Sequence, residues 1–278
     1  MPLCQRAESS CGACCGLYNR ADHSREALQE LLDRRTDRVR AAPRTAAGFA
    51  EAAADLARQG DGEPLFPTVR ICPLLGWLDE SRTRVGCLAH PAVCGQDLRD
   101  QGAYDAGICE TFLCPSHGHF SVEEADLVGA VCGADPYLYG LTVTDVDFVR
   151  ACLRAVAQLC GDEVRARHLA HAPFRAALRR LFQLKEELAP GSDGLYGAFR
   201  PGVDGEPVDR QIDYQALARP RSPHDLILRC IGADPRSGND LDAIEETLGR
   251  RLDGCVEAFP APGPSARPAP YPPAPYPE

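Results

Sequence analysis

Cysteine is the residue that most constrains this chain, because 14 of its 278 residues are cysteines and nine of those precede Pro115. The nine recur at short spacings that match neither a helix nor a strand. The chain begins Met1-Pro2-Leu3-Cys4, without a basic stretch followed by an apolar run, so we expect a cytoplasmic protein with reduced thiols. Clustered reduced thiols are typical of metal ligands, and simple packing or disulfides explain such spacings less well.

The first cluster reads Cys11-Gly12-Ala13-Cys14-Cys15-Gly16. Two residues separate Cys11 from Cys14, so a tight turn can present both sulfurs to one ion, and the glycines permit its backbone. Cys14 and Cys15 are adjacent, and adjacent side chains diverge. Two alternatives follow: one ligates while the other packs, or each serves a different metal. Cys4 is an additional candidate.

The second group consists of Cys72, Cys87 and Cys94, and a third pair, Cys109 and Cys114, follows it. Residues 74–85 have the pattern of a hairpin, in which a polar turn separates two apolar arms. Such a hairpin would bring Cys72 and Cys87 together. The candidate metal ligands are eight cysteines: Cys11, Cys14, Cys15, Cys72, Cys87, Cys94, Cys109 and Cys114.

Three motifs follow one another in the order Cys-Gly-x-Cys-Cys, Cys-Pro-hydrophobic-Leu and Cys-x-x-His-Pro-x-x-Cys. This order resembles that of the YkgJ-type CxxCxxCC family of zinc- or iron-chelating proteins. A flagellin lysine N-methylase with an iron–sulfur cluster is similar to that family. The resemblance covers residues 11–94, with an unmatched insertion at 25–59. This chain has Glu8 where the family has its first cysteine, and His90 and Gly95 where arginines are frequent. The matching positions are Cys11, Cys14, Cys15, Cys72, Cys87, Pro91 and Cys94.

Two cofactors fit a set of thiolates, an iron–sulfur cluster, of the [4Fe-4S] type, or zinc. The short Cys11/Cys14 pair is typical of zinc. Dispersed ligands with apolar neighbours such as Leu74, Trp77 and Leu88 favour the cluster. Eight cysteines allow one four-cysteine site with spares, or two sites. The charged residues after Cys94, which include Arg99, favour a solvated turn over hydrogen bonds to the ligands.

The remaining pattern predicts a mainly α protein. An irregular, cysteine-rich, metal-stapled module at 1–120, with a helical insertion at about 24–59, packs on a helical bundle at 121–258. A disordered Pro-rich tail at 259–278 follows. The expected helices cover 25–41, 43–58, a segment from Ser121, 144–161, 162–189 with a break at Pro173, 222–231 and 239–255. Ser121 with Glu124 predicts a capping box, Thr144 is the expected cap of its helix, and Asp135 and Asp234, each before a proline, read as N-caps. Residues 190–210 read as a long loop, and the five later cysteines as packed hydrophobes.

The sequence excludes some functions without naming one. A net charge of −10 argues against a nucleic-acid partner, and no apolar run reaches the ~18 residues of a membrane span. We find no P-loop, dinucleotide fingerprint or nucleophile elbow, so whether the chain is an enzyme stays open. We expect a metal-binding protein in redox or metal handling, with an unidentified protein as a potential partner. The alternatives are a methylase-like protein-modification enzyme with a structural cluster, and a zinc-stapled interaction module.

Overall fold

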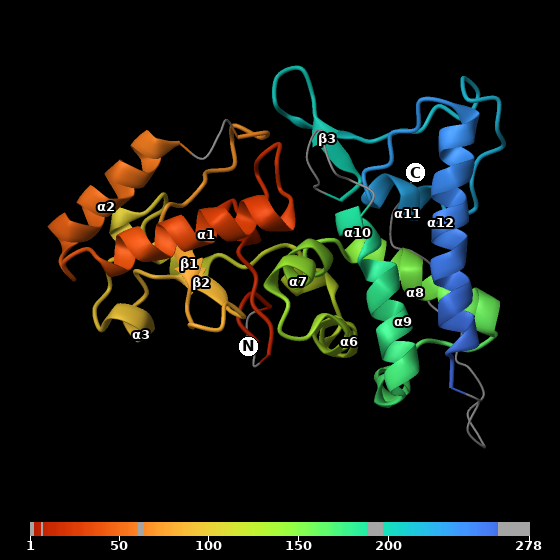
Figure 1. Ribbon diagram of the computed structural model, residues 1–278, viewed down its shortest axis with the longest axis horizontal. Helices are drawn as coiled ribbons and strands as arrows, with labels where there is room; N and C mark the ends of the chain where they lie inside the picture. Colours follow the sequence, from red (N-terminus) through yellow and green to blue (C-terminus); the bar gives the residue numbers. More distant parts are fainter. Residues whose placement is uncertain (1–2, 7, 61–63, 188–196, 261–278) are drawn as a thin grey trace.

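The computed structural model describes residues 3–6, 8–60, 64–187 and 197–260, and it confirms a mainly helical protein. Figure 1 shows α1, α2 and the β1–β2 hairpin at one end of the molecule. Helices α8, α9, α11 and α12 lie at the other end, with α6 and α7 between them. Most of the expected tail, residues 261–278, lies outside the described residues. Within the described part, no helix combines the length and apolar character needed to cross a bilayer.

The helical insertion contains α1 (Arg25–Arg40) and α2 (Ala46–Gln59), as expected. Ser24 caps α1 by accepting a hydrogen bond from the backbone N–H of Ala27 at 3.3 Å. Helix α2 starts three residues later than Pro43 suggested. Thr45 is its N-cap and accepts from the Gly48 N–H at 3.1 Å, while Pro43 closes the preceding turn.

The expected hairpin is present as β1 (Leu75–Trp77) and β2 (Val85–Cys87), antiparallel with Leu75 opposite Cys87. It packs against α1, where Thr36 Oγ1 accepts a hydrogen bond from the Trp77 N–H at 2.8 Å. A Cβ at Gly76 would lie 2.7 Å from that same oxygen, so the close approach requires glycine. The hairpin and α1 therefore form one packed unit.

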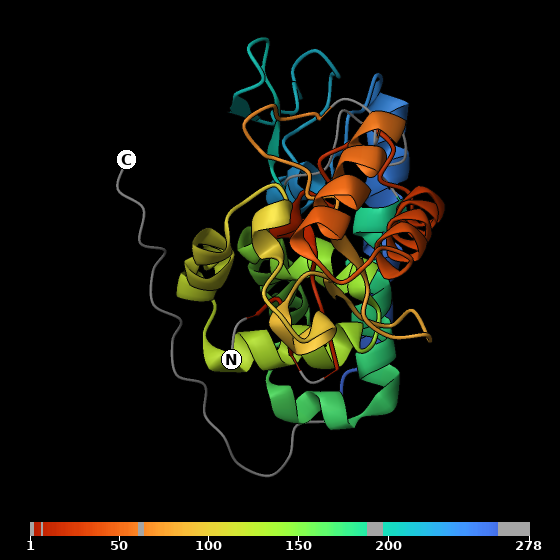
Figure 2. The same ribbon diagram turned by 90° about the vertical axis from the view of Figure 1, so that its left-hand side faces the viewer.

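Five short helical segments interrupt the rest of the N-terminal region. They are η1 (Ala13–Cys15), α3 (Pro91–Cys94), η2 (Arg99–Gln101), α4 (Ala106–Thr111) and α5 (Ser116–His119). Three of them, η1, α3 and α4, contain cysteines. None of the residues of α4 is buried. Figure 2 shows this helix, coloured olive, at the periphery of the molecule.

The second half is a succession of helices. They are α6 (Val122–Cys132), α7 (Pro136–Val143), α8 (Val146–Cys160), η3 (Ala166–Ala170), α9 (Ala172–Phe182), α10 (Leu184–Glu187), α11 (Asp225–Cys230) and α12 (Gly238–Glu257). The predicted capping box at the start of α6 is confirmed, since Ser121 and Glu124 each accept the other's backbone N–H, at 3.1 and 2.8 Å. Pro173 lies in the first turn of α9, which is the predicted break.

Three local expectations were wrong. Asp145, not Thr144, caps α8, because its carboxylate accepts from the Phe148 N–H at 2.9 Å. Ser237 caps α12, so Asp234 is not a helix cap. A second hairpin, β3 (Phe199–Pro201) with β4 (Pro207–Asp209), replaces part of the long loop expected at 190–210, of which 190–196 lie outside the described residues.

The hydrophobic core does not divide at residue 120. The largest buried cluster fills the space between α6, α8, α9, α11 and α12, and it also contains Leu3 and Cys11. A second cluster joins Leu28 of α1 to Tyr137 and Leu141 of α7. The two halves of the chain therefore share buried apolar surface.

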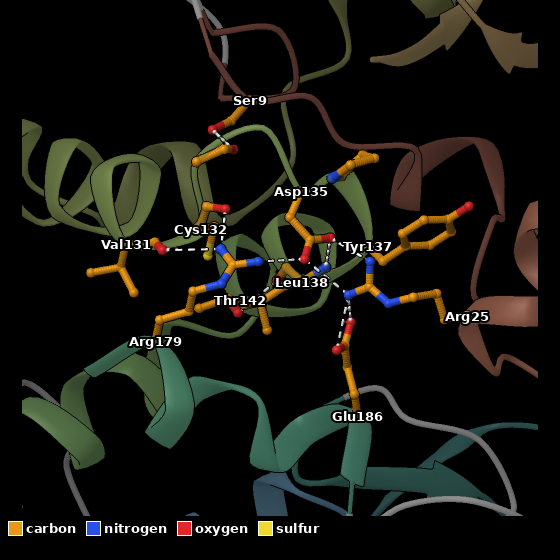
Figure 3. A network of polar contacts seen from close by, with 12 residues as sticks. Ser9, Arg25, Val131, Cys132, Asp135, Tyr137, Leu138, Thr142, Arg179 and Glu186 are labelled. Atoms are coloured by element: carbon orange, nitrogen blue, oxygen red, sulfur yellow. Dashed lines mark hydrogen bonds and ion pairs between the residues drawn. The ribbon is translucent and has the colours of Figure 1, made fainter. Parts of the chain in front are cut away.

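A polar network also joins the two halves (Figure 3). Asp135, the N-cap of α7, accepts hydrogen bonds from Arg25 of α1 at 3.0 and 2.9 Å, and from Arg179 of α9 at 2.6 Å. Arg25 also donates to Glu186 of α10, at 2.6 and 3.0 Å. Four helices are thus connected through one half-buried cluster of charges, in which each carboxylate has an arginine partner.

Candidate metal centre

The first cysteines are placed by a short antiparallel turn. Gln5 and Ser10 form an isolated β-bridge, and the Cys11 N–H donates to the Cys4 carbonyl at 3.0 Å. The next residues form η1, which ends at Gly16 with a φ of 79°. A Cβ at Gly16 would lie 2.5 Å from the Arg70 carbonyl oxygen. Only glycine therefore lets this turn lie directly against the backbone segment that leads to Cys72.

One group of four thiols, which we call the inner set, consists of Cys15, Cys72, Cys87 and Cys109. The Cys72 N–H donates to the Cys15 carbonyl at 2.9 Å, and the hairpin carries Cys87 to the same place. Burial raises the pKa of Cys15 well above its ordinary value, and negative charge on the other three thiols raises it further. Burial, Cys72 and Cys109 likewise raise the pKa of Cys87 to about 12.

A second group, the outer set, consists of Cys4, Cys11, Cys14 and Cys114. The interaction between the Cys14 and Cys114 thiols raises the pKa of Cys14 and lowers that of Cys114. Burial raises the pKa of Cys11 to about 12, and charge on Cys4 and Cys114 acts in the same direction. The backbone N–H of Ala13 donates to Cys11 Sγ at 3.4 Å. The outer set therefore joins the N-terminal turn to the residues that precede α5.

The two sets differ in their surroundings. Cys72 is buried in an apolar cluster with Leu74, Leu88 and Leu98, and Cys15 and Cys87 pack against that cluster. In the outer set Cys4 and Cys14 are exposed to solvent, and only Cys11 is buried. The inner set is thus the drier site and the outer set the wetter one.

Arg99 supplies a buried positive charge to the inner set. Its side chain is only 8% exposed, and its charge lowers the pKa of both Cys87 and Cys109, against the effect of burial. Asp97 fixes the guanidinium with two hydrogen bonds, at 2.8 and 2.6 Å. The expected solvated turn holds for Asp97 and Asp100, which are exposed, but not for Arg99. The sequence offered a signal, a charged turn directly after Cys94, but no indication that the arginine turns inward.

Cys94, another of the predicted ligands, lies in the same buried apolar cluster as Cys72, against which Cys15 and Cys87 also pack. Cys94 Sγ donates to the Gln96 carbonyl at 3.0 Å and to the His90 carbonyl at 3.5 Å. The other seven predicted cysteines fall into the sets, and Cys4 completes the outer one.

Within the part of the chain that the structure describes, no three Cys, His, Asp or Glu side chains stand at the mutual positions of a formed metal site. The chemistry of the donors fits a thiophilic metal. Thiols that raise one another's pKa resist ionisation together, and a bound cation reverses that effect and deprotonates them.

A pocket of about 370 Å³ lies elsewhere, between the start of α1 and α10. Arg25, Tyr137 and Glu186 line it, and no cysteine of either set does. The chain matches no protein-family model, no curated protein and no solved structure. The functional argument therefore comes from the thiol sets themselves.

Proposed function

We propose that this chain binds a cysteine-ligated metal centre, an iron–sulfur cluster or zinc, and acts in redox or metal handling. The observation that carries the proposal is the inner set. Its four thiols come from four separate stretches of chain, η1, the approach to β1, the end of β2 and α4. Cys15, Cys72 and Cys87 nevertheless meet at one apolar cluster, and charge on Cys109 raises the pKa of Cys15 and Cys87. Four thiols are the ligand number of zinc and of iron–sulfur clusters.

Simple packing does not account for the inner set. Four of the five cysteines of the helical half are enclosed in its core, as Cys152 and Cys230 are, and the fifth, Cys160, packs partly buried against it. Cys109 is instead exposed, on a helix without a single buried residue, and a buried arginine faces it. An exposed thiol beside one buried thiol, two half-buried ones and a guanidinium is an arrangement that favours a bound anionic metal–thiolate complex.

The surroundings of the inner set favour the iron–sulfur cluster over zinc. Apolar side chains enclose it, and the Arg99 guanidinium would offset the negative charge of a thiolate-ligated cluster. A bound cluster would supply one-electron transfer. Cys109 reaches the surface, so the edge of the centre would be open to an electron donor or acceptor. The resemblance to the CxxCxxCC family points to the same choice of metals.

The same centre would staple the irregular N-terminal module onto the helical bundle. Helix α4 contacts the rest of the chain through few groups, among them the Ala106 N–H, which donates to Asp100 at 2.7 Å, and Arg99, which lies 3.6 Å from Glu110. A metal bond through Cys109 would fix this helix. Metal binding then contributes directly to folding, because the unfolded chain has no assembled site.

A zinc-stapled interaction module is the second candidate function. Three apolar side chains are each about half exposed near these cysteines: Ile108 directly before Cys109, and Phe112 and Leu113 directly before Cys114. Apolar surface of this kind is typical of contact with another protein. This function requires zinc in the inner set and a colourless protein.

The test is metal analysis of protein purified without oxygen. We expect iron and sulfide with broad visible absorbance, and we expect the double variant Cys72→Ser/Cys109→Ser to lose both. Cys160→Ser, a half-exposed cysteine on α8, is the matched control and should retain them. Stoichiometric zinc without colour would select the interaction module. Wild-type protein without metal, or a double variant with undiminished metal, would contradict the proposal.

A further inference from the structure

The seven consecutive residues 107–113 are all exposed to solvent, although three of them are large and apolar. Ile108, Phe112 and Leu113 are 47%, 55% and 53% exposed, and we call these three side chains the α4 face. The Phe112 N–H donates to the Ile108 carbonyl at 2.9 Å, so these two residues lie one helical turn apart. Single exposed apolar residues are ordinary, but three together on a helix without a buried residue indicate a contact surface.

The charges beside the α4 face are mostly negative. Four exposed carboxylates lie within residues 95–113: Asp97, Asp100, Asp105 and Glu110. Arg99 is the only basic residue in that range, and its side chain is buried. Arg70 adds one exposed positive charge nearby, where it donates to the Ala103 carbonyl at 2.9 Å. Apolar surface beside carboxylates is complementary to apolar surface beside lysine or arginine.

This charge pattern disfavours the other occupants of such a surface. A second copy of the chain would set the same carboxylates against one another, and each copy carries a net charge of −10. An anionic lipid surface would repel them in the same way. A basic protein gains both from the apolar contact and from the charges.

The position of the α4 face determines what its partner would reach. Cys109, the member of the inner set that is exposed, follows Ile108 directly on α4. Figure 2 shows α4 at the periphery of the molecule, where a second protein has access to it. A protein seated on the face would therefore lie against the exposed edge of the inner set.

We propose that the α4 face docks a basic protein, whose apolar surface covers Ile108, Phe112 and Leu113 and whose lysine or arginine side chains pair with the neighbouring carboxylates. The face is small, which suits the transient complexes of redox proteins, with less than about 1,200 Å² buried. The electron exchange of this partner with the inner set rests on the proposed function. Its binding to the face does not, and is the same whichever metal the inner set holds.

The test measures binding of a probe protein to the full chain by isothermal titration calorimetry at low ionic strength. The probe is cytochrome c, which is small and strongly basic, and its matched control is succinylated cytochrome c, whose lysines carry carboxylates instead. We expect cytochrome c to bind, and added salt to weaken the complex. The succinylated form should not bind.

Variants of the chain locate the binding surface. Ile108→Ser/Phe112→Ser should weaken the binding of cytochrome c about 10-fold or more, and Glu110→Gln about 2- to 3-fold. Leu159→Ser, at a site 53% exposed on α8, is the apolar control, and Glu246→Gln, at an exposed site on α12, is the charge control. Both controls should bind as wild type does. Circular dichroism checks that every variant keeps its helices.

Binding that Ile108→Ser/Phe112→Ser leaves unchanged would overturn the proposal, as would equal binding of the two forms of cytochrome c or the absence of any. A dimer in sedimentation that this double variant abolishes would assign the face to a second copy, and would also overturn it. Metal analysis of the same protein separates the two proposals. Specific docking on metal-free wild type would support the α4 face and contradict the metal centre, whereas bound metal without docking would do the reverse.

Discussion

The two halves of the molecule use the same residue in opposite ways. In the helical half, Cys132, Cys152, Cys230 and Cys255 are at most 1% exposed and pack as small hydrophobes. In the N-terminal half, cysteines lie on short helices and turns, several of them exposed, with other thiols as their main neighbours. The comparison shows that the surroundings of a cysteine, and not its burial alone, distinguish a core residue from a ligand.

The halves should also differ in what holds them together. The helical half has a large apolar core, whereas much of the N-terminal half consists of segments too short to be stable alone. We therefore expect metal to stabilise the N-terminal half and apolar packing to stabilise the helical half. The predictions that follow test this contrast, from the largest effect to the smallest.

Removal of metal should have the largest effect, and only on the N-terminal half. Trp77, the only tryptophan, is buried between α1 and the hairpin, so its fluorescence reports that half. A chelator should lower the free energy of unfolding of the N-terminal half by several kcal/mol. For comparison, binding of structural zinc contributes about 10–16 kcal/mol to the folding of zinc-finger peptides. The measurement is denaturant unfolding followed by fluorescence. An unchanged Trp77 transition after metal loss would refute the contrast.

A core substitution in the helical half should act without regard to metal. Phe148 is fully buried on α8 and packs against Phe182, with ring centroids 5.8 Å apart. Phe148→Ala should lower the free energy of unfolding by about 3–5 kcal/mol, equally with and without chelator. Denaturant unfolding followed by circular dichroism measures this loss. Val122→Ala is the neutral control, because Val122 is 79% exposed. A loss that depended on metal would mean that the halves are not distinct.

Arg99 should tune the inner centre without being essential to the fold. Arg99→Met removes the buried charge beside Cys87 and Cys109, so thiolates there become less stable. We expect metal affinity to fall about 10- to 100-fold. Competition with a chelator measures this, and Arg250→Met, on the exposed face of α12, is the control. Equal affinity in the two variants would exclude an electrostatic role for Arg99.

The smallest effect should come from the capping box of α6. Burial raises the pKa of Glu124, but hydrogen bonds from Arg150 and Ser121 outweigh it and lower the pKa below 4.5. The stabilisation is therefore complete above pH 4.5 and is lost as pH falls through the lowered pKa. Glu124→Gln should cost about 0.5 kcal/mol near neutral pH after solvent screening, and progressively less in acid. The measurement is the free energy of unfolding of wild type and of Glu124→Gln at several pH values, with and without metal. If the difference between the two proteins does not change with pH, the ionised Glu124 carboxylate is not what stabilises the helix.

Local rules predicted much of this fold. The two helices of the insertion, the first hairpin and the capping box are all encoded within a few residues of one another, and all are confirmed. The errors arose where neighbouring residues compete for one role. Thr144 and Asp145 are both good N-caps, and only the backbone decides that Asp145 reaches the Phe148 N–H. The β3–β4 hairpin lies in a Gly- and Pro-rich stretch without an alternating pattern.

The partition of the cysteines could not be predicted from spacing. Sequence showed which cysteines are clustered, but not that Cys14 and Cys15 face different partners, or that Cys94 donates to backbone carbonyls instead. Those facts depend on how the turn at Gly16 lies against the Arg70 backbone, which is a tertiary contact. The inward position of Arg99 depends on the same packing.

The most direct test of a thiolate-ligated centre is X-ray absorption at the edge of the bound metal in anaerobically purified protein. The account predicts a first shell of sulfur alone, at about 2.3 Å, with sulfur ligation lost from the inner centre in Cys72→Ser/Cys109→Ser. A first shell dominated by oxygen or nitrogen, or a spectrum that this double variant does not change, would contradict it.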